Sequence, residues 1–280
     1  MSPTLPLAQQ LLHSTVRIEC RDVSGNVSSG TGFHFRFPFN DQWMPAIVTN
    51  KHVIEDAKEC TFVLTQADQD GQPTSTHVPF TITDINPNVW IWHPDPDVDL
   101  ALMPLQVLLQ DAGRSGIRPF YIDLNLSLVP SNEVWASLSP IEDVTIIGYP
   151  NGIWDASNNR PIVRKGVTAT ACNVPYLGMN QFLIDSAIYP GSSGSPVFIF
   201  QRGGSFNEGG LQMGTRLHLV GIVHAVYLHT ATGELVEIDA PTSNEIAISR
   251  LPNNLGICTS ASELHGFGSV IRERASRKRQ

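Results

Sequence analysis

The sequence predicts an all-β protein, folded as a β-sandwich or as a pair of β-barrels. Short runs rich in β-branched and aromatic residues recur along the chain, with turn residues between them. Helical periodicity is almost absent. The chain has 280 residues, of which 41% are hydrophobic and 16% charged, so it can form one large β domain or two lobes with separate cores.

Twelve segments have the composition of strands, six in each half of the chain. They cover residues 15–20, 32–37, 45–50, 60–65, 80–85, 99–105, 143–150, 166–172, 182–188, 195–200, 218–228 and 234–240. Insertions rich in polar residues, glycine or proline, such as QADQDGQPTST, NGIWDASNNRP and QRGGSFNEGG, predict hairpin loops between strands.

The order of these segments divides the chain into six expected parts. The stretch between the halves lacks clean alternation and contains DAGRSG, which is typical of a linker. The parts are an N-terminal extension (1–13), a first β lobe (14–105), a linker (106–130), a second β lobe (131–241), a helix (242–254) and a tail with a basic end (255–280).

The helix is predicted from a capping pattern in TSNEIAISRL. Thr242 can cap the first turn, Glu245 follows three residues later, and Pro241 lies directly before the cap.

Charge is unevenly distributed along the chain. The formal net charge is −8, and the last nine residues, RERASRKRQ, carry five basic residues and one acidic residue, a net +4. The rest therefore carries −8 − 4 = −12, which disfavours nucleic-acid binding by the body of the protein. Only the basic tail remains as a contact for nucleic acid, and we expect it to be a solvated, disordered terminus.

The sequence also predicts a cytoplasmic protein without metal or cofactor. No run of about 18 apolar residues occurs, and the first residues lack the positive region and apolar core of a secretory signal. The four cysteines are far apart and form no pattern of zinc ligands. We expect them to be small buried side chains, with a disulfide as the alternative. Their positions are Cys20, Cys60, Cys172 and Cys258.

A glycine-flanked turn in YPGSSGSPVF is the first candidate for chemistry. It places Ser192, Ser193 and Ser195 on a sharp bend, and the residues that follow directly are predicted to form a buried strand. A polar hairpin loop is the alternative interpretation. Catalysis by a serine would also require a base, an acid that orients the base, and donors for an oxyanion.

A histidine and an aspartate in the first half can supply the base and the acid. His52 follows the buried run in IVTNKHV, on a turn where an imidazole can face a cleft. Asp99 directly precedes an apolar strand in HPDPDVDLALMPL, whereas Asp95 and Asp97 belong to the preceding loop. The acidic loop also suggests a cation site, but no glutamate or carbonyl-rich loop completes one.

Five motifs in this order resemble the landmarks of trypsin-like serine proteases of the chymotrypsin superfamily. They are SGTGFHF, VTNKHV, DVDLALM, IIGYP and DSAIYPGSSGSPVF, and the likeness extends from about Ser14 to Leu251. The version is closest to the bacterial Deg/HtrA-type protease domain, without the PDZ domain that often follows it. The resemblance implies two six-stranded antiparallel β-barrels with the active site between them.

The resemblance also implies a role for each candidate. His52 is similar to the general base, Asp99 to the orienting acid, and Ser193, the serine of G-x-S-G-x-P, to the nucleophile. The N–H groups of Gly191 and Ser193 can then point into one oxyanion hole.

Two departures from the secreted members of the superfamily affect regulation and compartment. Ser192 stands where they have the aspartate used in activation, so zymogen cleavage of that kind is not expected. Val53 stands where they often have a cysteine, which fits a reducing compartment.

The expected substrate pocket consists of Ala187, His224, Ala225 and Val226. By the resemblance, Ala187 matches the pocket floor, and Val226 replaces a glycine and narrows the mouth, so we favour a small aliphatic residue before the scissile bond. Asp185 lies on the same strand face as Ala187 and keeps a basic preference open. His224 is either a reader of acidic side chains or, as we favour, a structural residue beside Asp99.

We therefore expect a bacterial serine endopeptidase that acts on protein or peptide substrates, with a regulatory protein partner as a further possibility and no membrane contact. The alternative is a protease-like module that binds a peptide or partner without cutting it.

Overall fold

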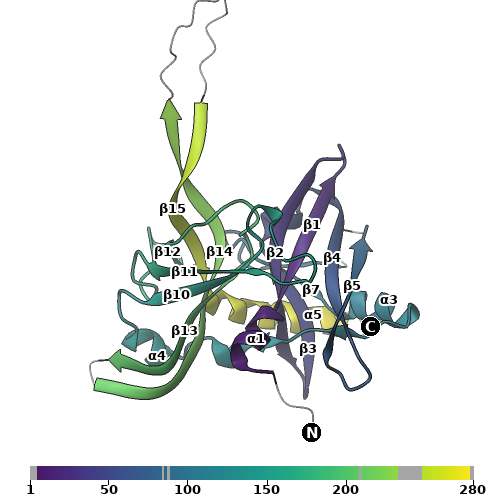
Figure 1. The fold of residues 1–280 in the computed structure, drawn as a ribbon, viewed down its shortest axis with the longest axis horizontal. Coiled ribbons are helices and arrows are strands. Elements are labelled where there is room, and N and C mark those ends of the chain that lie inside the picture. Colours follow the sequence, from purple (N-terminus) through teal and green to yellow (C-terminus); the bar gives the residue numbers. More distant parts are fainter. Residues whose placement is uncertain (1–4, 84, 87–88, 208–209, 233–247, 278–280) are drawn as a thin grey trace, which may run out of the picture.

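The computed structural model describes residues 5–277 except 84, 87–88, 208–209 and 233–247. Within these residues the chain forms two β lobes side by side (Figure 1), and the predicted all-β fold is confirmed. A short C-terminal helix is present as predicted, but it covers residues 267–277 and not 242–254. The expected strand at 234–240 lies outside the described residues.

The N-terminal lobe is built on six longer strands that pair in the order β5-β4-β1-β2-β3-β7. Three strands of two residues each extend this sheet to nine. The bounds are β1 (Thr15–Asp22), β2 (Val27–Phe39), β3 (Gln42–Thr49), β4 (Ala57–Ala67), β5 (Pro73–Ile82), β6 (Ile91–Trp92), β7 (Ala101–Pro104), β8 (Pro119–Phe120) and β9 (Leu124–Asn125).

The C-terminal lobe is a closed barrel of six antiparallel strands in the order β10-β11-β12-β15-β14-β13. Its strands are β10 (Asp143–Gly148), β11 (Ile162–Thr168), β12 (Gln181–Asp185), β13 (Pro196–Asn207), β14 (Gly210–Thr232) and β15 (Ile248–Ser260). The predicted loop QRGGSFNEGG is instead strand on both sides of residues 208–209, because β13 and β14 pair as a long hairpin.

Short helices connect and flank the two lobes. The α-helices are α1 (Leu7–Leu12), α2 (Lys51–Ile54), α3 (Gln106–Arg114), α4 (Asn132–Ser137) and α5 (Phe267–Arg277), and the 3-10 helices are η1 (Leu126–Leu128), η2 (Pro150–Gly152) and η3 (Ala261–Gly266). The expected linker, 106–130, contains α3 and η1, and its strands β8 and β9 pair with β4 and β2 of the first lobe.

The helix predicted over 242–254 is wrong for the residues that the structure describes. Residues 248–254 belong to β15, whose part from Ile248 to Pro252 pairs with β14 and whose part from Leu255 to Thr259 pairs with β12. Pairing with β14 therefore overrides the local capping pattern. The cap itself, with Thr242 and Glu245, lies outside the described residues.

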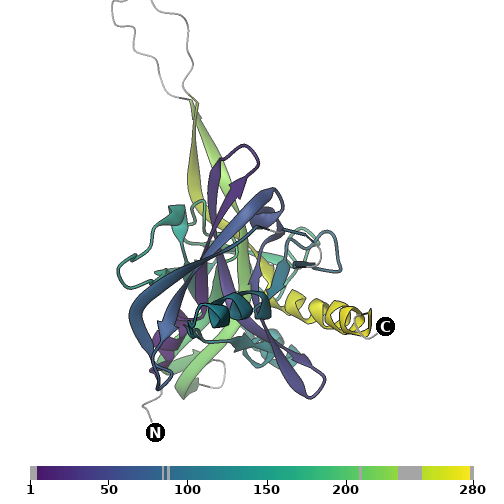
Figure 2. The same cartoon turned by 90° about the vertical axis from the view of Figure 1, so that its right-hand side faces the viewer.

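The basic tail is also more ordered than predicted. Most of it belongs to α5, which runs from the C-terminal barrel across to the N-terminal lobe (Figures 1 and 2). Phe267 and Ile271 of this helix are buried, and the ring of Phe267 packs edge-on against Phe37 of β2 with 5.7 Å between centroids. Apolar side chains spaced one turn apart therefore fix this segment on the sheet.

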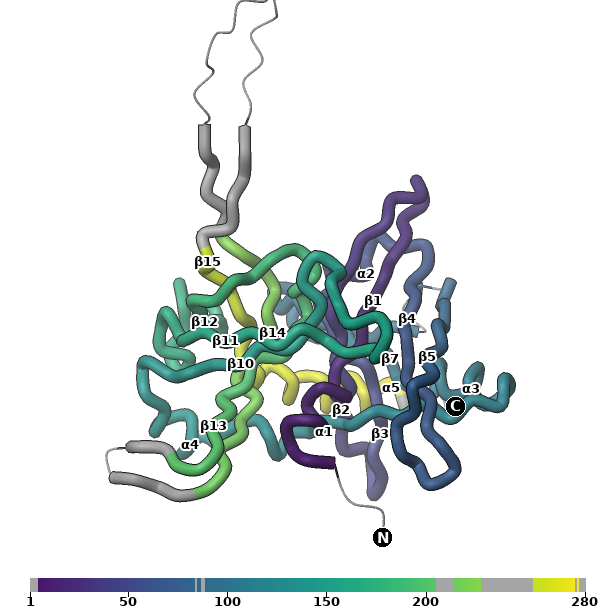
Figure 3. Tube along the Cα trace, in the orientation of Figure 1, coloured from purple at the N-terminus to yellow at the C-terminus, as the bar shows by residue number. Residues whose placement is uncertain are grey.

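Three apolar cores hold the lobes together. One fills the N-terminal sheet around Ile18 and Phe62, and another fills the C-terminal barrel around Phe182 and Val197. The third lies between the lobes and contains side chains of β2, β14 and α5, together with Leu11 of α1, which lies beside both lobes (Figure 3). Alternate residues of β2 face this shared core, so packing positions the two sheets relative to each other.

Candidate active site

His52 lies in the single helical turn α2, directly after the buried end of β3. Ala46 to Thr49 are fully buried, and the following Asn50 has a fully buried side chain whose amide donates to the backbone oxygen of Asp99 at 2.6 Å. The turn therefore starts where the chain leaves the core, and Asn50 ties it to the segment before β7.

Asp99 and His52 make two contacts with each other. Nδ1 of His52 is 2.5 Å from Oδ2 of Asp99, and the backbone N–H of His52 donates to Oδ1 at 3.2 Å. A carboxylate only accepts hydrogen bonds, so Nδ1 carries the proton and Nε2 is left as the acceptor. The imidazole is 42% exposed and the carboxyl 26% exposed, so the ring remains accessible while the carboxyl is mostly covered.

The other two candidate acids remain in the preceding loop. The carboxyl of Asp95 accepts the backbone N–H of Asp97 at 2.9 Å, which stabilises the bend. Lys51 reinforces this loop, because its ammonium donates to the backbone oxygens of Asp95 and Pro96 at 3.3 and 3.1 Å. Asp99 is thus the one of the three that contacts His52 within the described part of the chain.

Ser193 lies between two glycines with left-handed backbone conformations. Gly191 and Gly194 both have φ of +85°. A Cβ at Gly191 would lie 2.6 Å from the carbonyl oxygen of Tyr149, and one at Gly194 would overlap the carbonyl oxygen of Thr31. Both positions therefore require glycine for two reasons: the left-handed backbone conformation and the close approach of another backbone segment.

The three serines of this turn differ in exposure and partners. Ser192 and Ser195 are 3% and 1% exposed, and their hydroxyls bond to the N–H of Tyr189 and to the hydroxyl of Thr31. Ser193 is only partly buried, and its hydroxyl donates to the backbone oxygen of His224 at 3.5 Å, a long contact. Of the three serines, Ser193 is the least buried and has the longest hydroxyl contact.

The backbone N–H groups of the serine turn differ in their hydrogen bonding. In the described residues, the N–H groups of Gly191 and Ser193 donate to no protein acceptor, whereas those of Ser192, Gly194 and Ser195 do. Donors that remain available at a turn can stabilise a developing negative charge.

Thr31 of β2 connects the two halves of the site, and sequence analysis did not identify it as a candidate. Its N–H donates to the oxygen of Ser193 at 2.8 Å, and its hydroxyl donates to the oxygen of Gly191 at 2.9 Å. The same hydroxyl accepts the N–H of Tyr149, and the oxygen of Thr31 accepts the hydroxyl of Thr49. No local signal distinguishes Thr31 within GTGFHF, because its partner Gly191 lies 160 positions away in the chain.

The expected pocket residues lie on β14 and on the segment before the serine turn. His224, Ala225 and Val226 are half-buried, and the pairing of β14 with β15 shifts register on both sides of this segment. Such bulges redirect side chains beside active sites. Ala187 is half-buried, whereas Asp185 at the end of β12 is exposed.

His224 is held by a structural hydrogen bond. Its Nδ1 is 3.2 Å from the hydroxyl of Thr259 on β15. Burial lowers the pKa of His224, with the charge of Asp99 acting in the opposite direction and that of His52 adding to the decrease. A neutral imidazole at this position disfavours recognition of an acidic side chain.

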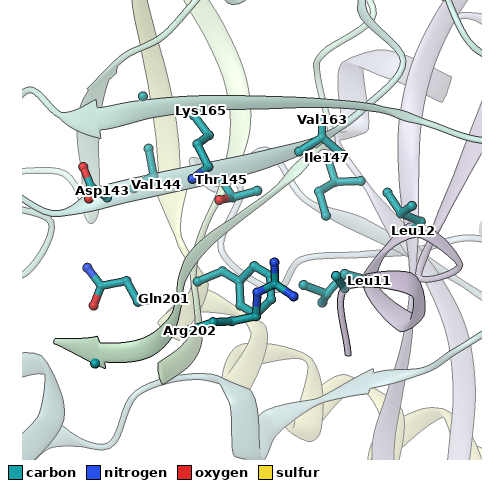
Figure 4. Close-up of a pocket in the computed structure, with 14 residues that line it drawn as sticks. Leu11, Leu12, Asp143, Val144, Thr145, Ile147, Val163, Lys165, Gln201 and Arg202 are labelled. Atoms are coloured by element: carbon teal, nitrogen blue, oxygen red, sulfur yellow. The ribbon is translucent and has the colours of Figure 1, made fainter. Parts of the chain in front are cut away.

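A separate groove lies on the outside of the C-terminal barrel, between β10, β11, β13 and α1 (Figure 4). Its volume is about 640 Å³, and its lining combines apolar side chains of α1 with Lys165 and Arg202. None of the candidate catalytic or pocket residues lines it.

The fold and this arrangement of side chains define a chymotrypsin-like protein. A family model described as a trypsin-like peptidase domain matches residues 30–204, and the chain belongs to this family. No curated protein matches the sequence.

Several solved structures are similar to the chain. The active form of a protease from M. tuberculosis shares 16% identity, with 93% of this chain and 82% of that chain covered and a TM-score of 0.45. An inactivated protease paralogue of the scabies mite shares 13% identity, with coverages of 94% and 96% and a TM-score of 0.46. Tobacco etch virus protease in complex with product shares 12% identity, with coverages of 93% and 78% and a TM-score of 0.46.

In the part of the chain that the structure describes, every helix is too short or too polar to cross a membrane.

Proposed function

We propose that the protein is a serine endopeptidase that cleaves peptide bonds through an acyl-enzyme. Ser193 is the nucleophile, His52 takes its proton and returns it to the leaving amine, and Asp99 holds the imidazole in the required tautomer. The N–H groups of Gly191 and Ser193 stabilise the oxyanion of each tetrahedral intermediate. Water then attacks the acyl-enzyme, with His52 again acting as the base.

The observation that carries the proposal is the pair of contacts between His52 and Asp99. The short contact from Nδ1 to the carboxyl assigns the proton to Nδ1, and the N–H of His52 binds the second carboxyl oxygen. A purely structural histidine has no need for two contacts to one carboxylate while its ring remains 42% exposed. An accessible base is what an activated serine requires.

A small aliphatic residue before the scissile bond fits the pocket best. Val226 packs against the apolar core of the C-terminal barrel, and Ala187 contributes no charge. A substrate lysine or arginine would have to bury its charge there unless it reached Asp185, which is exposed at the end of β12. We therefore assign the pocket to residues of the size of alanine or valine.

A protease-like module that binds peptides without cleaving them is the second candidate. The observation in its favour is that the hydroxyl of Ser193 contacts the backbone oxygen of His224. Hydrogen bonds of catalytic residues are often long in the absence of substrate, so this contact is compatible with activity.

Labelling with a fluorophosphonate probe separates the two candidates, because the probe requires an activated serine and no known substrate. We expect the wild type to be labelled and Ser193→Ala to lose both labelling and peptide cleavage while keeping its thermal stability. Ser192→Ala and Ser195→Ala are the matched controls and should keep most activity. An unlabelled wild type would support the binding module, and a labelled Ser193→Ala with an inactive Ser195→Ala would mean that the nucleophile is misassigned.

This proposal also includes four points from the sequence analysis: the Deg/HtrA-type affiliation, a bacterial source, a cytoplasmic location and a regulatory protein partner. The order of the five motifs supports the first two, and Val53 beside His52 supports the third. Regulation by a partner rests on the absence of the activating aspartate at Ser192.

A further inference from the structure

Two cysteines face each other on adjacent strands of the N-terminal lobe. Cys20 of β1 and Cys60 of β4 are direct partners in the antiparallel register. Opposite residues in such a pair have Cα atoms about 4.5–5.5 Å apart, which lies within the range of about 4.4–6.8 Å that disulfides span. The backbone therefore already has the separation that a disulfide needs.

The sulfur atoms of these two residues are also very close. Their separation is 2.7 Å, whereas even non-bonded carbon atoms, which are smaller than sulfur, stay about 3.5–4.0 Å apart. Two thiols at this distance are crowded, and both side chains are fixed by a packed core in which they are 2% and 0% exposed. A covalent bond removes this crowding with little movement of either strand.

The surroundings determine when such a bond can form. Both thiols lie in the apolar core of the N-terminal sheet with Ile18, Phe62 and Ile82. The hydrogen bond to Cys20, followed by burial, raises the pKa of Cys60. Exchange requires a thiolate, so the folded protein reacts slowly, and oxidation has to occur before β1 and β4 are fully packed.

We propose that Cys20 and Cys60 form a cross-strand disulfide when the chain folds in the presence of a small-molecule disulfide such as oxidised glutathione. One protein thiolate attacks the glutathione disulfide, which gives a mixed disulfide and one reduced glutathione. The second protein thiolate attacks the mixed disulfide at the protein sulfur and releases the second reduced glutathione. The protein loses two protons and two electrons, and the glutathione disulfide gains them.

The bond would close a loop that contains one member of the proposed triad, His52, and Thr31. Between Cys20 and Cys60 lie β2, β3 and α2, and therefore Thr31 and His52. Closing a loop of this length restricts the unfolded chain and stabilises the native one. The proposal is independent of whether the protein is a peptidase, because it concerns the sheet that carries these residues and not their chemistry.

The inference also bears on the predicted compartment. The sequence predicts buried thiols in a cytoplasmic protein. Disulfides persist mainly outside the reducing cytoplasm, so a stable bond between Cys20 and Cys60 would count against that location. Cys172 and Cys258 lie in the core of the other lobe, and in the described residues only Cys20 and Cys60 have sulfur atoms in contact. These two other cysteines provide an internal reference.

The direct test is to refold the reduced, unfolded full-length protein in a glutathione redox buffer, and then to alkylate it in denaturant without reductant. We expect mass spectrometry to find the peptides that carry Cys20 and Cys60 as one linked species, lighter by two hydrogens than the two peptides together. Prior reduction should release both for alkylation. Recovery of Cys20 and Cys60 as separate alkylated peptides from the unreduced protein would overturn the proposal.

A stability measurement tests the same bond without relying on recovery of peptides. We expect the Tm of the wild type to be roughly 5–15 °C higher after oxidative than after reductive refolding. This difference should vanish in the double variant Cys20→Ala/Cys60→Ala and persist in the matched control Cys172→Ala/Cys258→Ala. A redox-dependent difference that survives in the first variant would assign the bond elsewhere.

Discussion

The two lobes hold their halves of the candidate active site by different means. In the N-terminal lobe, His52 and Asp99 are fixed by side-chain contacts: carboxyl to imidazole, carboxyl to the N–H of His52, and the Asn50 amide to the backbone of Asp99. In the C-terminal lobe, Ser193 is fixed by backbone conformation, between two glycines with positive φ. The first half therefore depends on functional groups, and the second depends on the absence of side chains.

This difference predicts which substitutions each half tolerates. An isosteric substitution that removes a charge should lower activity more in the N-terminal half than in the C-terminal half, because the N-terminal half depends on hydrogen bonds to a carboxylate. The addition of a single methyl group should damage the C-terminal half, since its backbone approaches Tyr149 and Thr31 closely. Thr31 belongs to the first lobe but binds the serine turn of the second, so it couples the two halves.

The largest effect is expected for Asp99→Asn. The amide keeps the shape of the carboxyl but favours the wrong tautomer of His52, so kcat should fall by up to about 10⁴. Steady-state cleavage of a peptide substrate measures this. Asp97→Asn is the matched control, because its carboxyl belongs to the loop, and it should be nearly unchanged. Full activity of Asp99→Asn would remove the proposed role of this carboxyl.

A smaller loss is expected for Gly191→Ala. The new Cβ would meet the carbonyl oxygen of Tyr149 at 2.6 Å in a backbone conformation with φ of +85°, so the N–H of the oxyanion hole must shift. Removing one such donor costs about 10²–10³ in kcat. Gly178→Ala is the matched control, since Gly178 has φ of +80° with no atom within 4 Å of the added Cβ. Equal losses in both variants would attribute the effect to strain alone.

Val226→Gly should change specificity without weakening catalysis on a matched substrate. Widening the pocket mouth should extend the preference from alanine and valine towards leucine, methionine and phenylalanine, by about 10–200-fold in relative kcat/KM. A profiling library of peptides measures this. Two results would contradict this assignment. One is dominant cleavage after glutamate or aspartate that is lost in His224→Ala. The other is dominant cleavage after lysine or arginine that is lost in Asp185→Ala.

The last prediction concerns the free energy of unfolding in acid, and we expect this effect in the N-terminal lobe. Burial and the charge of His13 lower the pKa of His34 on β2 from 6.5 to about 3. Burial and then Arg160 lower that of His13 to about 4. Both histidines bind protons more readily in the unfolded chain than in the native protein. Above about pH 6.5 they are neutral in both states, and the free energy of unfolding decreases as the pH falls towards 3 to 4.

Urea unfolding at several pH values measures this loss, which for His34 is up to about 1.4 kcal/mol per pH unit. Burial raises the pKa of Asp123 from 3.8 to about 6, with Arg36 acting in the opposite direction, and this carboxyl gives an opposite contribution between about pH 6 and 4. His34→Phe keeps an aromatic ring against Tyr121, on which the imidazole stacks, and should flatten the acid dependence. An unchanged slope in this variant would show that His34 is not responsible.

The sequence alone was sufficient for the fold class and for naming the candidate residues. Alternation of apolar residues predicts strands because each strand covers a core on one face. His52 and Asp99 could be selected because each adjoins a buried strand, and Ser193 because glycines flank it in YPGSSGSPVF. The structure brings His52 and Asp99 into contact, whereas within the described residues the hydroxyl of Ser193 bonds to the backbone oxygen of His224 and not to His52.

Only the tertiary structure decided what depends on residues far apart in the chain. Pairing with β14 made residues 248–254 a strand, and a shared apolar core ordered most of the basic tail as part of α5. The register of β1 against β4 placed Cys20 opposite Cys60 across 40 positions of sequence, and the packing of one lobe on the other placed Thr31 against Gly191 across 160. Local propensity contains no information about such pairs, because hydrogen-bond register and packing between sheets arise only when the whole chain is folded.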